Sequence, residues 1–145
     1  MSGLAFIRAI RDARVAPPPI ASVFDFAITD VEVGRVVFEC TPDESVYNPI
    51  GVVHGGLVCT LADSVVGCAV QTTLDARVAY TSVDLNVSYL RPVTVDSGRL
   101  RAIGRVTKPG RRVAFASAEI FDASDKPVAM ATSTLLIMDG RAAAP

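Results

Sequence analysis

The sequence predicts an α+β domain in which an antiparallel sheet wraps around one long helix. The chain has 145 residues, half of them hydrophobic, so one domain can bury a core without disulfides. Apolar residues recur at helical spacing from residue 57, and four segments with strand character follow residue 77. We divide the chain into an N-terminal helix with a proline-rich linker (1–20), a single domain (21–140) and a tail (141–145).

The N-terminal part of the chain predicts a short helix and two strands. Apolar residues at helical spacing favour a helix over 3–15. Three prolines at 17–19 end that helix and begin an extended linker. Strands are predicted over 23–29 and 35–41, with Gly34 near the turn between them.

The middle of the chain changes from a loop to a helix and then to a strand. Residues 42–56 are rich in Pro, Gly, Asn and Asp, which is typical of a loop. From Leu57 to about Thr73, apolar residues at i, i+3 and i+4 predict a helix at the centre of the core. From Arg77 to Pro92, apolar and polar residues alternate as in a strand with one buried face. The apolar members of this alternation are Val83, Leu85, Val87 and Tyr89.

Three more strands, over about 98–107, 113–121 and 128–138, complete the predicted sheet. The last strands carry apolar residues on both faces, as where Ala116 follows Phe115. One face can cover the long helix. We expect the other face to be buried against a partner subunit.

Charge, hydropathy and cysteine content narrow the function classes. The net charge of −1 provides no basic excess for binding nucleic acid or an anionic membrane surface. No apolar run reaches the roughly 18 residues of a membrane helix, and arginines interrupt the N-terminal segment, unlike a secretory signal. Three scattered cysteines indicate reduced thiols, and a single histidine leaves too few ligands for a zinc site. We therefore expect a cytoplasmic protein without a metal.

The polar residues with the clearest chemical meaning lie at the start of the long helix. Gly55 and Gly56 place backbone N–H groups at the positive end of the helix dipole, where glycine lets a ligand approach closely. This combination suits the oxyanion of a polarised thioester or ester carbonyl. A simple junction between loop and helix explains the same residues. His54 is compatible with a general base or with a hydrogen bond that orients the loop.

Asp63 lies off the apolar stripe of the helix, on a face that it shares with Gly56, Thr60 and Gly67. A solvated acid and a functional acid both fit, although a face of small residues suggests close approach of another group. Gly55 and Asp63 are eight residues apart, or about 12 Å along one helix. They cannot both touch one carbonyl within a chain. If both act, the site lies across a two-fold dimer.

Four basic residues are candidates for binding phosphates. Lys108, Arg111 and Arg112 lie at one predicted turn, and Arg91 ends a strand. An ordinary charged turn explains the first three as well. The sequence has no GxSxG, P-loop or GxGxxG motif, so nucleotide-binding and serine-hydrolase interpretations lack support. Cys59 lacks a partner for nucleophilic catalysis and is interpreted as a core residue.

Two motifs, in this order, resemble the hotdog-fold acyl-CoA thioesterases, and within them the phenylacetate-degradation-type branch. The first is Asn48-Pro49-x-Gly51-x-x-His54-Gly55-Gly56-x6-Asp63, and the second runs from Thr81 to Pro92 as TSVDLNVSYLRP. The resemblance covers about residues 34–138 and implies a curved antiparallel sheet around a central helix. It also implies homodimers, commonly paired into homotetramers, that act on acyl-CoA without a further cofactor.

The resemblance implies a role for each motif residue. Asp63 would start thioester hydrolysis as general base or nucleophile, and the N–H of Gly55, with that of Gly56, would polarise the carbonyl. The four basic residues named above would contact CoA. Asn48 and His54 would help position the thioester and the loop, and Ser82 would orient the water or Asp63 from the opposite strand.

Two other functions remain open beside thioester hydrolysis. A non-catalytic acyl-CoA-binding or regulatory protein on this fold would lack the acid at position 63. A hotdog hydratase or dehydratase would pair a histidine with an acid in another arrangement, and this chain has only His54. For a thioesterase, the apolar helix and N-terminal segment suit an aromatic or medium-chain acyl group, and the resemblance implies an aryl or arylacetyl thioester.

Overall fold

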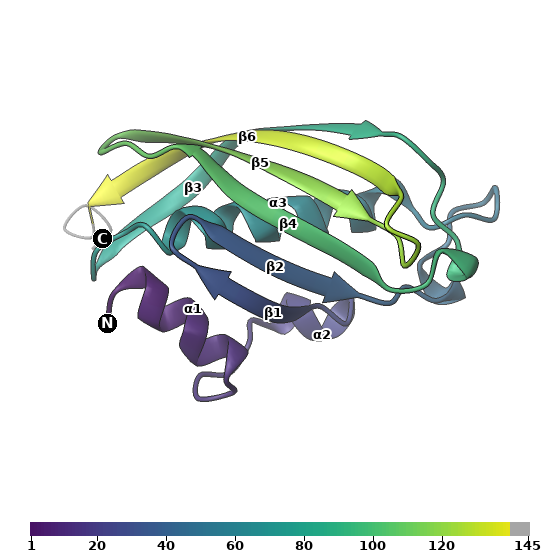
Figure 1. The fold of residues 1–145 in the computed structure, drawn as a ribbon, viewed down its shortest axis with the longest axis horizontal. Coiled ribbons are helices and arrows are strands. Elements are labelled where there is room, and N and C mark those ends of the chain that lie inside the picture. The colour runs from purple at the N-terminus through teal and green to yellow at the C-terminus, as the bar shows by residue number, and fades with distance from the viewer. Residues whose placement is uncertain (140–145) are drawn as a thin grey trace.

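One long helix, α3 (Gly55–Gln71), lies inside a curved sheet of six antiparallel strands in the computed structural model, which describes residues 1–139 (Figure 1). The strand order is β1-β2-β4-β5-β6-β3. This arrangement confirms the predicted α+β class and hotdog fold, while the predicted tail (141–145) lies outside the described residues. The strands are β1 (Ala27–Glu32), β2 (Arg35–Cys40), β3 (Val78–Tyr89), β4 (Leu100–Lys108), β5 (Val113–Phe121) and β6 (Pro127–Asp139).

The N-terminal helix α1 (Gly3–Arg11) is shorter than the predicted helix over 3–15. Ser2 caps its start by accepting a hydrogen bond from the Ala5 N–H at 3.3 Å. Ala13 adopts a positive φ of 55°, which no helix continues through. α1 packs against α3 and against β1, which is an edge strand of the sheet (Figure 1).

A second helix, α2 (Pro19–Val23), replaces the end of the predicted linker and the start of the strand predicted over 23–29. That prediction was wrong at its first residues because proline fits the first position of a helix, where its missing N–H costs nothing. Asp25, at a φ of 54°, then turns the chain into β1. The helix and this bend place α2 beside the edge of the sheet (Figure 1).

A β-bulge in β3 changes which side chains face α3. The pairing with β6 shifts between Ser82 and Asp84, so Val83 is an extra residue on β3. Val83 is 64% exposed, although the predicted alternation placed it on one face with Leu85. Because of the bulge, Ser82 and Leu85 both face inward: Ser82 reaches the helix and Leu85 packs against the core.

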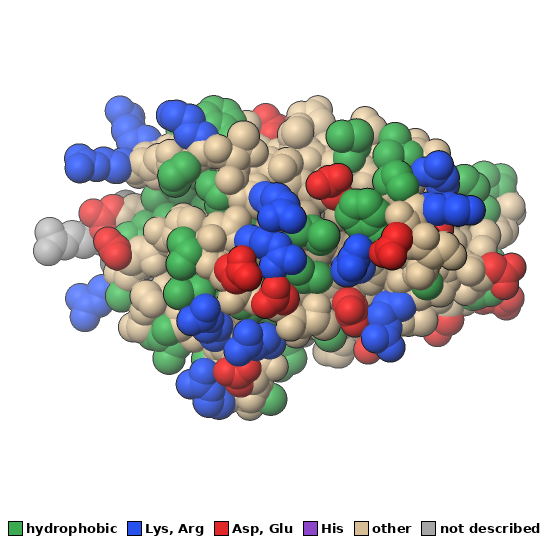
Figure 2. Space-filling view, in the orientation of Figure 1, with side chains coloured by type: hydrophobic (Ala, Val, Ile, Leu, Met, Phe, Trp, Pro, Cys, Tyr) green, Lys and Arg blue, Asp and Glu red, His purple; other side chains and the backbone are tan. Residues whose placement is uncertain are grey.

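The outer face of the sheet exposes hydrophobic side chains among charged ones (Figure 2). On β5 and β6, Phe115 is 43% exposed, Met130 50% and Leu136 42%. These residues form the second apolar face that the sequence predicts for the last strands. Its burial against a partner subunit remains a prediction.

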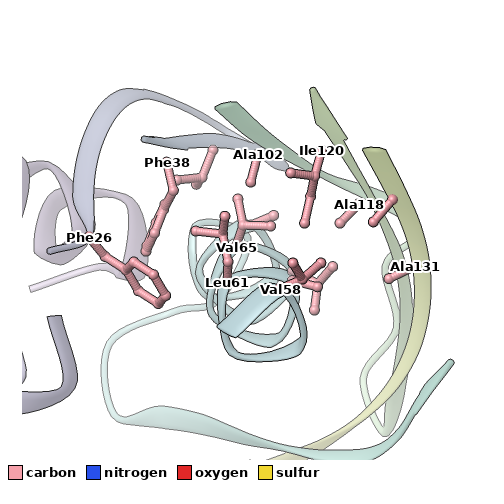
Figure 3. Packing of buried hydrophobic residues seen from close by; sticks show 14 of the residues in the cluster. Phe26, Phe38, Val58, Leu61, Val65, Ala102, Ala118, Ile120 and Ala131 are labelled. Carbon is pink, nitrogen blue, oxygen red and sulfur yellow. The ribbon is translucent and has the colours of Figure 1, made fainter. Parts of the chain in front are cut away.

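The hydrophobic core lies between α3 and the inner face of the sheet. In Figure 3 the strands curve around the helix, and Val58 and Val65 point toward Ala102 and Ile120. At Gly104, β4 approaches the helix so closely that a Cβ would overlap the carbonyl of Val65. The predicted central role of the helix is confirmed, and its packing leaves Asp63 on the exposed side of the helix.

Candidate active site

The start of α3 presents one backbone N–H group to a ligand. His54 is the N-cap residue, and its Nδ1 accepts a hydrogen bond from the Gly56 N–H at 2.9 Å. The His54 carbonyl accepts one from the Leu57 N–H at 3.0 Å. The Gly55 N–H donates to no acceptor within residues 1–139. This N–H group lies at the positive end of the helix dipole, so it can donate a hydrogen bond to an anionic or carbonyl oxygen that binds at the start of α3.

These contacts distinguish the two glycines that the motif places together. The Gly56 N–H, which the resemblance paired with that of Gly55 as an oxyanion donor, is already bonded to His54. Of the two roles open for His54, the structure contains the hydrogen bond to backbone. Because Nδ1 accepts, the neutral ring carries its proton on Nε2.

A cavity of about 430 Å³ opens at this end of the helix. The side-chain oxygen of Asn48 accepts hydrogen bonds from the N–H groups of Ile50 (3.1 Å) and Val52 (3.3 Å), so this residue holds the loop. Arg91 donates to the Pro127 carbonyl at 2.6 Å, at the end of β3. Five of the predicted residues line the cavity: Asn48, His54, Gly55, Gly56 and Arg91.

Tyr89 lines the same cavity, and the sequence did not single it out. Its hydroxyl donates to the Gly55 carbonyl at 3.0 Å and lies 2.9 Å from the sulfur of Cys59. The hydrogen bond with Cys59, together with burial, raises the pKa of Tyr89 to about 12, so the hydroxyl keeps its proton at neutral pH. A Cβ on Gly55 would lie 2.9 Å from the Tyr89 oxygen. Cys59 is half-buried in this contact and is not the core residue that the sequence suggested.

Asp63 lies on the exposed side of α3 and accepts a hydrogen bond from the Ser82 hydroxyl at 2.8 Å. The bulge at Val83 produces this contact, because it leaves Ser82 facing the helix. The structure thus brings together two predicted site residues that lie 19 positions apart in the sequence. The hydroxyl fixes one carboxylate oxygen of Asp63 and leaves the other available.

The face of small residues beside Asp63 does admit another group closely. A Cβ on Gly67 would overlap the hydroxyl of Tyr80, whose ring lies against the helix at this point. Asp63 and Tyr80 both line a second cavity, of about 660 Å³.

Asp63 and Gly55 belong to different cavities of the chain. The helical rise separates them by about 12 Å, as the spacing predicts. One chain therefore does not direct the free N–H and the carboxylate at the same carbonyl.

The basic residues also separate. Lys108, Arg111 and Arg112 are exposed around the turn from β4 to β5, at one end of the long axis in Figure 1. Arg91 lines the cavity at the start of α3, and its backbone N–H donates to the Val128 carbonyl at the start of β6, whereas the Arg112 carbonyl accepts from Ile137 near the end of that strand. A single chain does not bring these four candidates for CoA binding together.

Among residues 1–139, no three His, Cys, Asp or Glu side chains are grouped as metal ligands. No helix in that part of the chain has the length and hydropathy to cross a membrane.

Comparisons with known proteins bear on this fold and site. Residues 50–129 match the family model of the thioesterase superfamily. Human acyl-coenzyme A thioesterase 13 is 32% identical over 87 residues, which are 60% of this chain and 61% of that protein. The match thus spans about three fifths of that relative's length.

Two solved structures share the fold over nearly their whole length. A phenylacetic acid degradation-related protein from Ralstonia eutropha JMP134 has a TM-score of 0.81 and 27% identity, covering 89% of this chain and 97% of that one. A thioesterase family protein from Silicibacter pomeroyi has a TM-score of 0.82 and 25% identity, covering 92% and 98%. The family model matches more than half of this chain, and the chain has the hotdog fold and the motifs around Gly55 and Asp63. The chain therefore belongs to the thioesterase superfamily.

Proposed function

We propose that this protein is a thioesterase that hydrolyses an acyl-CoA to a carboxylic acid and free CoA, using Asp63 of one chain and the Gly55 N–H of another. The observation that carries the proposal is that one chain holds a carboxylate and a free N–H group ready for a ligand, but in different cavities. Asp63 is held by Ser82 beside an open cavity, and the Gly55 N–H has no acceptor among the described residues. No metal or redox cofactor takes part in the proposed reaction.

In the proposed reaction, Asp63 removes a proton from water as the water oxygen attacks the thioester carbon. The carbonyl oxygen becomes an oxyanion, which accepts a hydrogen bond from the Gly55 N–H. The tetrahedral intermediate collapses, the C–S bond breaks, and the CoA sulfur leaves as a thiolate that takes up a proton. In the alternative course, Asp63 attacks the carbon itself and forms an anhydride that water then cleaves. In this course the C–S bond also breaks and CoA leaves as a thiolate, and single turnover in ¹⁸O-labelled water places the label in Asp63 when water attacks the Asp63 carbonyl of the anhydride, so label in Asp63 identifies the anhydride route.

The sheet edge formed by β3 is the proposed dimer contact. β3 is the last strand of the sheet and offers twelve residues for pairing on its open side. Tyr89 packs at the Gly55 end of α3 and Tyr80 packs at Gly67, so β3 and α3 run in opposite directions. Antiparallel pairing of two β3 strands about a two-fold axis places the Gly55 end of one chain beside the Asp63 region of the other. The exposed face with Phe115 is the proposed contact between two such dimers.

The cytoplasm is the proposed compartment. Cys40, Cys59 and Cys68 are all free thiols in the structure. Free thiols of this kind persist where glutathione keeps proteins reduced.

The test is thiol release from an acyl-CoA panel, combined with mixed dimers. Wild type should release CoA, and Asp63→Asn should lose at least about a hundredfold in kcat, or about 2.7 kcal/mol of barrier stabilisation. A mixed dimer of one Asp63→Asn chain and one Gly55→Pro chain, purified through two tags, should regain about half of the wild-type rate, because one of its two sites is intact.

A mixed dimer as inactive as its parents would contradict the two-chain site. Full activity of Asp63→Asn would remove Asp63 from the mechanism. Binding of acyl-CoA without turnover by wild type would favour the non-catalytic function, and loss of enoyl-CoA absorbance without thiol release would favour a hydratase.

A further inference from the structure

The cavity beside Asp63 is walled by the N-terminal segment of the chain. α1, the linker and α2 form one side, and β1, β2, β3 and α3 form the others. Its volume of about 660 Å³ lies in the range of sites that enclose a whole small-molecule ligand. The apolar side chains that carry the argument are Ile7, Ile10, Ile20, Ala21, Phe26 and Phe38.

The cavity borders the helix α3 from Asp63 to Gln71. Four residues of α3 line it in succession: Asp63, Ser64, Cys68 and Gln71. Asp63 and Gln71 are eight positions apart, so the lined stretch measures about 12 Å. An acyl group whose carbonyl lies at Asp63 can therefore contact about two turns of α3.

The wall beyond Asp63 is uncharged where the helix and β3 form it. Burial raises the pKa of Cys68 to about 12 and also raises the pKa of Tyr80, so both stay neutral at physiological pH. Arg11 lines the cavity, but its guanidinium donates to Asp12 at 2.8 Å. An anionic ligand would have to compete for Arg11, whereas an apolar chain would bury its surface at no such cost.

We infer that this cavity receives the acyl group of the thioester, and that the group is a medium-chain fatty acyl chain extending from Asp63 toward Gln71. The inference rests on the proposed thioesterase function and assigns its substrate class. An acetyl group would leave most of the cavity empty, and an arylacetyl ring would occupy only the end next to Asp63. The N-terminal helices thereby act as specificity determinants, with Ala21 in the part of the wall that α2 forms.

The test measures kcat/KM for acetyl-, hexanoyl-, octanoyl-, decanoyl- and phenylacetyl-CoA. For wild type we expect a rise of about fourfold for each added methylene up to decanoyl, which is the gain from burying one methylene. Ala21→Leu narrows the cavity and should lower the ratio of decanoyl- to hexanoyl-CoA activity by about tenfold. Cys68→Leu narrows it from the helix side and should act in the same direction. Ala5→Leu is the matched control, because Ala5 is an exposed residue of α1 outside the cavity lining.

A chain-length profile that Ala21→Leu and Cys68→Leu leave unchanged would overturn the assignment of the cavity. A preference for acetyl- or phenylacetyl-CoA over decanoyl-CoA would overturn the substrate class. If wild type releases no thiol from any substrate, the proposed function fails separately. Calorimetric binding of decanoyl- and acetyl-CoA then tests the cavity directly, with tighter decanoyl binding that Ala21→Leu weakens as the supporting result. Thermal melting confirms that each variant folds, and Ala21→Val replaces Ala21→Leu if that variant does not.

Discussion

Replacing Gly55 with proline removes the proposed oxyanion donor while leaving the backbone in place. Gly55 is the first residue of α3, where proline's fixed φ suits a helix and its missing N–H breaks no internal hydrogen bond. His54 has a ψ of 132°, which is the extended conformation that a residue before proline prefers. The substitution thus removes the N–H donor with a backbone that suits the start of the helix, and it adds ring carbons, of which the Cβ would lie close to the Tyr89 hydroxyl.

The contacts of the neighbouring N–H groups set the size of the expected effect. The Gly56 N–H is bonded to the His54 ring and the Leu57 N–H to the His54 carbonyl, so neither replaces the lost donor without breaking the cap. Loss of one oxyanion donor lowers kcat by about 10²–10³, or about 2.7–4 kcal/mol. We expect Gly55→Pro to fall in this range.

Gly55→Ala is the control for the added carbon. Its Cβ would lie 2.9 Å from the Tyr89 oxygen, as would the proline Cβ, but the alanine keeps its N–H. Both variants are assayed by CoA release at saturating substrate and by thermal melting. If the two folded variants have equal kcat, the steric change accounts for the loss and the Gly55 N–H is not the donor.

Three further predictions concern the carboxylate, the core and a buried thiol. Ser82→Ala removes the hydrogen bond to Asp63 and should lower kcat by about tenfold to a hundredfold, since a bond to a charged group contributes about 1.5–3 kcal/mol; an unchanged kcat would dismiss Ser82 as a positioning residue. Gly104→Ala should cost at least about 1–3 kcal/mol in urea unfolding, because its Cβ meets the rigid carbonyl of Val65. Burial raises the pKa of Cys40 from 9.0 to about 11, so the folded state favours the neutral thiol. This stabilisation is present below pH 9 and is lost as the pH rises through 11, and melting curves of Cys40→Ala over that range should show a weaker pH dependence.

The sequence was sufficient for the features that depend on periodicity. The 3.6-residue repeat located α3 to within two residues at each end, and the same periodicity placed Asp63 on the face opposite the core. Once the helix was predicted, the constant rise per residue was enough to predict that Gly55 and Asp63 lie too far apart to contact one carbonyl. These features are local, so neighbouring residues in the chain determine them.

The features that the sequence did not yield depend on contacts between distant segments. The bulge at Val83 adds one residue to a strand in which apolar and polar residues still alternate, so no change in the sequence pattern marks the bulge. The hydrogen bond from Tyr89 to Gly55 joins positions 34 apart. The helix from Pro19 was missed because a proline run equally suits an extended chain and a helix start. The first two depend on the tertiary structure, and the third on which of two local solutions packs better.

The bulge at Val83 makes the length of β3 matter more than its composition. Deleting this single residue would restore a regular ladder with β6 and reverse the orientation of one half of the strand relative to the other. Either Ser82 would turn away from Asp63, or Leu85 would leave the core. Substitutions of Val83 itself change only an exposed side chain. Relatives should therefore vary freely in the residue at this position while keeping the same number of residues in β3. A sequence alignment with a gap at this position would assign their side chains to the wrong face of the sheet.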